Sequence, residues 1–240
     1  MKVEAIEYRA DGARMIGTLA IDDARSGTRP GVLVCHEGPG LSDHAKNIAK
    51  RLAGLGYVAF AMDYHGDGQL LTDMGEVMRR IQAFMVDPSG IRARASAALA
   101  VLKSQPQTDP LRIAAIGYCF GGTTALELAR SGASVQAVVG FHSGLGTARP
   151  GDARNIKGKV LVQIGADDPI IPSEQRLAFE KEMTAGGVDW RLNLYGGAGH
   201  SFTNPQVNAL GRPGFKYHEP SDRRSWAAML DLFGEVFGAV

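Results

Sequence analysis

Residues 113–129 join a short apolar run, a glycine-rich turn and an Ala/Leu-rich stretch. The apolar run is typical of a buried strand, and residues 123–129 fit the start of a helix. Between them lies Gly117-Tyr118-Cys119-Phe120-Gly121-Gly122. A strand that turns sharply into a helix strains the residue at the turn, and side chains two positions away would crowd it, so glycine is favoured there. The sequence therefore predicts a strand–turn–helix unit with Cys119 at its apex, at a helix N-terminus that favours a thiolate.

Two interpretations of this Gly-x-Cys-x-Gly turn are open. In one, it is a tight crossover that holds a small buried cysteine. In the other, it is a nucleophile elbow with cysteine in the place usually taken by serine. The second interpretation requires an acid and then a histidine later in the chain, each just after a strand.

Both of these side chains are present in that order. Residues 160–164 form an apolar, strand-like run, and the turn after it carries Asp167 and Asp168. Residues 190–195 alternate like a strand, and a glycine-rich turn then leads to His200. A loop carboxylate is often only a turn former or helix cap, and a loop histidine is often only a surface residue. Their joint occurrence at strand ends, where open α/β sheets build their sites, favours a catalytic triad.

These motifs resemble those of the dienelactone hydrolase family of α/β-hydrolases, over a region from about Val32 to the C-terminal helix. The resemblance is carried by the Cys119 turn, by His36-Glu37-Gly38 after an early predicted strand, by Asp168 four residues before Pro172, and by His200-Ser201-Phe202.

The resemblance implies a role for each matching residue. Cys119 would be the nucleophile, Asp168 the acid and His200 the base. Glu37 would contact the resting cysteine and help to control its ionisation. The backbone N–H groups of Gly38 and Phe120 would form the oxyanion hole.

The resemblance also bears on the substrate. Family members that hydrolyse dienelactone bind its carboxylate with two arginines, and one of them lies four residues after the histidine, where this chain has Asn204. The other arginine matches Arg79 or Arg80, either of which could equally be a solvated helix residue. Because charge-assisted binding of the substrate carboxylate is weakened without this arginine, we expect neutral or weakly polar esters to be preferred over dienelactone. The candidate pocket residues are Tyr64, Arg80, Ser201 and Asn204.

The whole pattern predicts an α/β-hydrolase fold with a mostly parallel central sheet and helices on both faces, in one domain over residues 1–240. Asp11-Gly12 predicts a hairpin turn, and residues 144–158 and 203–220 are expected to be long loops. Strands are predicted at 6–10, 14–21, 32–36, 57–63, 112–118, 135–141, 159–165 and 189–195, and helices at 43–55, 72–86, 89–103, 120–131, 173–185 and from about 221.

Composition excludes several classes of protein. A net charge of +1 gives no reason to expect a nucleic-acid or membrane partner. Two cysteines form no disulfide framework, and Cys35 is expected to be a buried strand residue. No apolar run is long enough to span a bilayer and the N-terminus has no signal segment, so we expect a cytoplasmic enzyme, monomeric or homodimeric.

Other motifs are weaker. Asp63-Tyr64-His65-Gly66-Asp67 has metal-ligand residue types, but a strand-end loop near the active site explains it better. His36-Glu37 lacks the spacing of a zinc protease, and Gly38-Pro39-Gly40 lacks the third glycine of a dinucleotide site. We therefore expect no metal and no cofactor.

The functional expectation is a cysteine-dependent hydrolase of carboxylic esters or lactones that works through a thioester enzyme intermediate. The alternative within this class is a promiscuous hydrolase of activated aryl esters, phosphotriesters or thioesters. A non-catalytic binding protein or a thiol sensor on the same fold is the competing class.

Overall fold

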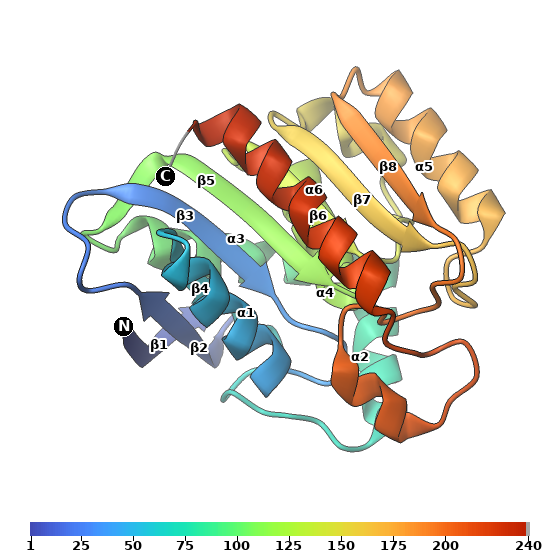
Figure 1. Ribbon diagram of the computed structural model, residues 1–240, viewed down its shortest axis with the longest axis horizontal. Coiled ribbons are helices and arrows are strands. Elements are labelled where there is room, and N and C mark those ends of the chain that lie inside the picture. Colours follow the sequence, from blue (N-terminus) through green and yellow to red (C-terminus); the bar gives the residue numbers. More distant parts are fainter. Residues whose placement is uncertain (239–240) are drawn as a thin grey trace.

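The computed structural model describes residues 1–238, and its centre is an eight-stranded sheet in the order β1-β2-β4-β3-β5-β6-β7-β8 (Figure 1). The first two strands in this order run antiparallel to their neighbours, and the other six are parallel. The strands are β1 (Lys2–Ala10), β2 (Ala13–Ile21), β3 (Arg29–Cys35), β4 (Val58–Ala61), β5 (Thr108–Tyr118), β6 (Ala137–Phe141), β7 (Lys159–Gly165) and β8 (Trp190–Tyr195).

Helices cover both faces of the sheet, as predicted. Helices α1 (Asp43–Gly54) and α6 (Glu219–Phe237) pack on the face nearer the viewer in Figure 1. The opposite face is covered by α3 (Ser89–Lys103), α4 (Phe120–Arg130) and α5 (Ser173–Ala185), and α2 (Met74–Val86) packs beside this layer. Each layer buries its own apolar cluster against the sheet, which supplies the main driving force for this arrangement.

The sequence explains why these strands form. Strands β3 and β4 are buried throughout, as their continuous apolar runs predict for parallel strands covered on both sides. The hairpin between β1 and β2 turns at Asp11 and Gly12, which both have positive φ (52° and 72°). This hairpin is longer than predicted: β1 begins at Lys2 because it pairs with β2 along its whole length, although much of it is exposed.

The segments predicted as long loops each contain one short helix: η1 (Pro150–Asn155) and η2 (Pro205–Leu210). Asn204 caps η2, since its side-chain oxygen accepts a hydrogen bond from the backbone N–H of Gln206. The η2 loop follows His200 beyond the carboxyl end of β8, whereas Ala153 of η1 lies against Gly186, just after α5.

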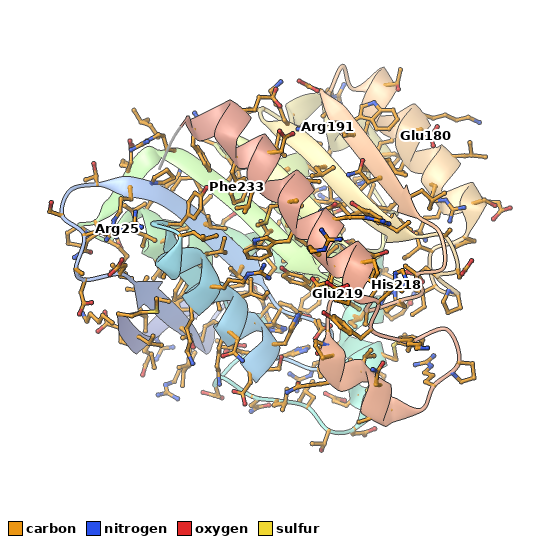
Figure 2. The ribbon with its side chains drawn as sticks, in the orientation of Figure 1. Arg25, Glu180, Arg191, His218, Glu219 and Phe233 are labelled. Carbon is orange, nitrogen blue, oxygen red and sulfur yellow. The ribbon has the colours of Figure 1, made fainter. Side chains whose placement is uncertain are left out.

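Helix α6 is held against the sheet in its C-terminal half, where Figure 2 labels Phe233 of the helix and Arg191 of β8. Phe233 of α6 is fully buried, and Arg191 of β8 forms ion pairs with Asp231 and Glu235 of the same helix. Within residues 1–238, no helix has both the length and the apolar character needed to cross a bilayer.

Candidate active site

Cys119 lies at the junction of β5 and α4, with φ 54° and ψ −124°. Such a positive φ is unusual for a residue with a side chain and marks a strained turn. The neighbouring glycines are required sterically. A Cβ at Gly117 would overlap the backbone of Gly121, and a Cβ at Gly121 would overlap the carbonyl oxygens of Cys35 and His36. The turn thus packs Gly121 against the end of β3 and leaves Cys119 partly exposed.

Asp168 and His200 meet at the carboxyl ends of β7 and β8. The Nδ1 atom of His200 lies 2.8 Å from Oδ2 of Asp168, and both side chains are buried. The other carboxylate oxygen of Asp168 accepts the N–H of Ile170 at 2.8 Å, which orients the carboxylate. The Nε2 atom of His200 is buried and has no hydrogen-bond partner among residues 1–238. This leaves one ring nitrogen of His200 available for chemistry.

The electrostatic environment of His200 favours its charged form. Burial disfavours an imidazolium, but the negative charge of a Cys119 thiolate and the Asp168 hydrogen bond outweigh burial and raise the pKa of His200 to about 10. Cys119 is thus close enough to His200 to interact with it strongly. A thiolate at Cys119 would form an ion pair with this imidazolium.

The two predicted oxyanion donors come from adjacent segments. Phe120 is the first residue of α4, and Gly38 follows β3. Neither backbone N–H has an acceptor among residues 1–238, as expected for a first helical residue. Gly38 lies against α2, since a Cβ there would be 3.1 Å from Ile81 and 3.3 Å from Val77.

The carboxylate of Glu37 is held by partners that sequence reasoning did not identify. Its Oε2 accepts a hydrogen bond from Nδ2 of Asn204 at 3.0 Å and lies 3.4 Å from Nδ1 of His44. The Glu37 side chain is only 13% exposed. The resemblance implies a contact between Glu37 and the resting Cys119, and the hydrogen bond that the Glu37 carboxylate accepts comes from Asn204.

Of the three other residues that were predicted to line a pocket, Tyr64 and Arg80 have structural partners and Ser201 is buried. Tyr64 is fully buried rather than open to a pocket, and its hydroxyl donates to the backbone carbonyl of Glu37. Arg80 is 34% exposed and pairs with Glu76, as Arg79 also does. Ser201 is buried in a positive-φ turn. These positions give no direct support for substrate contacts by Tyr64 or Arg80.

His142 is a buried residue of the site to which the sequence assigned no role. Its Nδ1 accepts the backbone N–H of Cys119 at 3.2 Å, and its Nε2 lies 2.9 Å from Oγ1 of Thr203. Burial, together with the nearby charges of His200 and His44, holds the pKa of His142 well below its usual value. His142 therefore stays neutral. It follows β6 directly, so its place after a buried strand was the signal that could have identified it.

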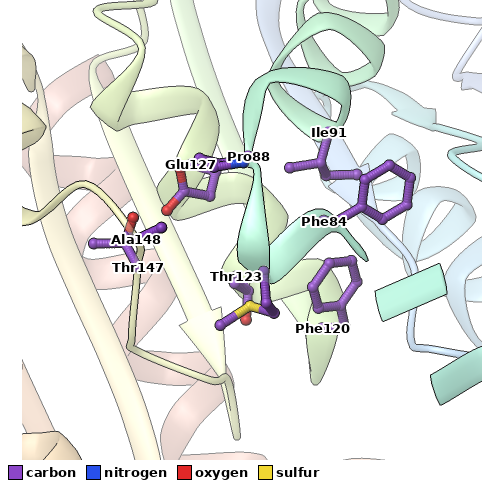
Figure 3. Close-up of a pocket in the computed structure, with 9 residues that line it drawn as sticks. Phe84, Pro88, Ile91, Phe120, Thr123, Glu127, Thr147 and Ala148 are labelled. Atoms are coloured by element: carbon purple, nitrogen blue, oxygen red, sulfur yellow. The ribbon is translucent and has the colours of Figure 1, made fainter. Parts of the chain in front are cut away.

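An apolar crevice runs beside the first turn of α4 (Figure 3). The rings of Phe84 and Phe120 are stacked along it, with centroids 6.2 Å apart. Because Phe120 follows Cys119 directly, this crevice borders the elbow. Its lining residues are Phe84, Met85, Pro88, Ile91, Phe120, Thr123, Glu127, Thr147 and Ala148. In the described part of the chain, no group of three His, Cys, Asp or Glu side chains is arranged to hold a metal ion.

Comparisons with known proteins agree with this geometry. A sequence profile of the dienelactone hydrolase family matches residues 16–237. The solved structure named m3DLH is 48% identical, with a TM-score of 0.96 over 98% of both chains. The dienelactone hydrolase-like promiscuous phosphotriesterase P91 from metagenomic libraries is 45% identical, with a TM-score of 0.94 over 99% of both chains. Protein usf of Aquifex pyrophilus is 28% identical over 84% of this chain and 87% of its own. The protein therefore belongs to the dienelactone hydrolase family and is a hydrolase acting on ester bonds.

Proposed function

We propose that the protein is a cysteine-dependent hydrolase of carboxylic esters or lactones in which Cys119 attacks the carbonyl carbon. The observation that carries this proposal is the convergence of three buried or half-buried groups. Cys119 sits at a strained turn, His200 has a free Nε2 that interacts with it, and Asp168 binds the other ring nitrogen at 2.8 Å. A binding protein would have no need for this combination.

The chemistry follows from the positions of these groups. The Cys119 thiolate forms a bond to the carbonyl carbon, and the electron pair of the C=O bond moves to oxygen. The N–H groups of Gly38 and Phe120 stabilise that oxyanion. The intermediate collapses to a thioester, and the alkoxide or enolate leaves with the proton of His200. Neutral His200 then takes a proton from water, which attacks the thioester and releases the acid and Cys119.

We propose that neutral or weakly polar esters are better substrates than dienelactone. At the position where dienelactone-hydrolysing relatives use an arginine, this chain has Asn204, and its amide is already bonded to Glu37. Arg79 and Arg80 share the single carboxylate of Glu76, so each guanidinium already has a partner within the chain. The test is to compare kcat/KM for dienelactone with kcat/KM for a neutral aryl ester. Much faster dienelactone turnover would contradict this proposal.

Hydrolysis of activated phosphotriesters is a second candidate activity. It is favoured by the 45% identity to a protein described as a promiscuous phosphotriesterase. A thiolate at a partly exposed elbow can attack phosphorus as well as carbon, and a good leaving group is required in both cases. Aryl esters and thioesters share this requirement. If one site performs all of these reactions, Cys119→Ala will abolish phosphotriester and ester hydrolysis together.

The proposed thioester can be trapped directly. Turnover of an aryl ester is quenched in acid, and the intact protein and its peptides are weighed by mass spectrometry. We expect the peptide that contains Cys119 to be heavier by the mass of the acyl group. Cys35→Ala is the matched control and should acylate normally, because Cys35 is fully buried and burial raises the pKa of its thiol. An acyl group on any other residue would overturn the proposal.

A further inference from the structure

The peptide group between Glu37 and Gly38 is held from one side by two buried donors. The hydroxyl of Tyr64 donates to the carbonyl oxygen of Glu37 at 2.8 Å. The Nδ1 atom of His36 lies 2.6 Å from the same oxygen. Most backbone carbonyls in a loop accept one hydrogen bond or face solvent, whereas this one is bound by two side chains that are completely buried.

The planarity of the peptide makes this contact relevant to the site. The C=O of Glu37 and the N–H of Gly38 belong to one rigid, trans unit, and they point in opposite directions. Fixing the carbonyl therefore fixes the direction of the N–H. We propose that Tyr64 and His36 are positioning residues that aim the Gly38 N–H into the oxyanion hole. This role rests on the proposed function, in which Gly38 stabilises the oxyanion.

The hydrogen-bond pattern assigns His36 as a donor at Nδ1. The backbone N–H of Tyr64 points to Nε2 of His36 at 3.4 Å, so Nε2 is the acceptor and Nδ1 carries the proton. Burial lowers the pKa of His36 to about 3, which keeps the ring in this neutral form. The rings of His36 and Tyr64 are stacked, with centroids 3.7 Å apart. The two donors thus form one rigid unit.

Tyr64 is also fixed as a donor. Burial raises the pKa of its hydroxyl well above its usual value, so the proton stays in place. The backbone carbonyl of Tyr64 accepts a hydrogen bond from Nη1 of Arg94 at 2.6 Å, which anchors the backbone of Tyr64. Donation to a peptide carbonyl also polarises that peptide, which makes its N–H a stronger donor. The pair of residues therefore improves both the direction and the strength of the Gly38 N–H.

The following peptide is held in a similar way. Nε2 of His65 lies 2.7 Å from the carbonyl oxygen of Gly38. The loop that carries Gly38 is thus tied at two successive carbonyls by side chains of residues 64 and 65, which lie in the loop after β4. Such preorganisation is what an oxyanion donor requires, since it must not reorient during the reaction.

Tyr64→Phe tests this role, because it removes the hydroxyl and keeps the ring. Loss of a whole oxyanion donor costs about 10²–10³ in kcat. Here the Gly38 N–H remains and His36 still binds the carbonyl, so we expect kcat for an aryl ester to fall by about 10-fold to 100-fold with KM nearly unchanged. Alkylation of Cys119 by iodoacetamide develops no oxyanion at a carbonyl, so its rate should remain within about twofold of the wild-type rate.

The matched control is Tyr8→Phe. The Tyr8 hydroxyl is also buried and bonds to the backbone of Asp63, next to Tyr64, but it does not contact the Glu37 carbonyl. The Tyr8→Phe variant should lose about as much stability as Tyr64→Phe and should hydrolyse the ester within about threefold of the wild-type rate. Unchanged hydrolysis in Tyr64→Phe would overturn the proposed role. A parallel loss of hydrolysis and alkylation would overturn it too, because that result indicates general damage to the elbow.

His36 supplies a second pair of variants, in case Tyr64→Phe does not fold. In His36→Asn the amide Nδ2 replaces the Nδ1 donor, whereas His36→Leu has no donor. We expect hydrolysis to be about tenfold faster in His36→Asn than in His36→Leu, with equal alkylation rates, and equal hydrolysis would overturn the role. Cys119→Ala is measured alongside. If it still hydrolyses the ester, the proposed function itself fails; if it is inactive while Tyr64→Phe is normal, only the positioning role fails.

Discussion

Asn204 and Glu37, 167 positions apart in the sequence, are joined by a 3.0 Å hydrogen bond between Nδ2 and Oε2. The other end of the Asn204 amide accepts the N–H of Gln206 at 3.0 Å. Both polar atoms of this side chain are therefore engaged within the protein. At the position where the family resemblance implies an arginine for a substrate carboxylate, Asn204 binds a carboxylate of the chain itself.

Removing this restraint should change the reactivity of Cys119. In Asn204→Ala the Glu37 carboxylate loses its hydrogen bond. The segment that carries Glu37 packs directly against Gly121, beside Cys119. A carboxylate that can turn towards the elbow disfavours a second negative charge there. We expect iodoacetamide to alkylate Cys119 about three to ten times more slowly at pH 7. Asn208→Ala, in the short helix that Asn204 caps, is the control, and an unchanged rate in Asn204→Ala would refute a restraining role.

The protonation of His200 gives a direct spectroscopic prediction. Its ring should titrate near pH 10 in an NMR experiment, because the Cys119 charge and the Asp168 hydrogen bond outweigh burial. In Cys119→Ala the midpoint should fall, since the negative charge is gone. A midpoint near the ordinary value of about 6.5 in the wild type would contradict the ion pair.

The raised pKa of His200 also affects the stability of the folded protein. The folded-state pKa of His200 lies above the unfolded value, so folding favours the protonated ring. This contribution is fully present below about pH 6.5 and is lost as the pH rises through about 10. Urea unfolding at a series of pH values measures it.

Gly121, two residues after Cys119, should tolerate no side chain. In Gly121→Ala the new methyl group would overlap the carbonyl oxygens of Cys35 and His36, and backbone atoms cannot move aside cheaply. We expect a loss of about 3 kcal/mol or more in the free energy of unfolding, or no folded protein. Gly146→Ala is the control, because nothing lies within 4 Å of its Cβ position. It should change stability by less than about 1 kcal/mol, and equal effects of the two changes would contradict this account.

The sequence predicted the fold because its signals are local. Apolar runs marked the buried parallel strands, Asp11-Gly12 marked the hairpin, and the glycines around Cys119 marked the turn that the structure contains. The closeness of Asp168 and His200 also followed from local signals, since both were placed at the carboxyl ends of predicted strands.

The remaining contacts of the site could not be predicted, because each joins side chains from distant segments. The bond from Asn204 to Glu37 and the contact of His142 with Cys119 depend on which rotamer each side chain adopts in the folded protein. The same holds for Tyr64, which the sequence placed in a pocket and the structure places behind the Glu37 peptide. Periodicity and motif spacing carry no information about such choices.

The most direct test of the central claim is the rate of aryl ester hydrolysis by Cys119→Ala, measured beside Cys35→Ala. In the proposed mechanism Cys119 forms the bond to the substrate, whereas Cys35 is buried in β3 with its sulfur 3.4 Å from the sulfur of Met62. We expect Cys119→Ala to lose at least about 10³-fold in kcat/KM and Cys35→Ala to stay within about threefold of wild type. Hydrolysis by Cys119→Ala within tenfold of the wild-type rate would contradict the account.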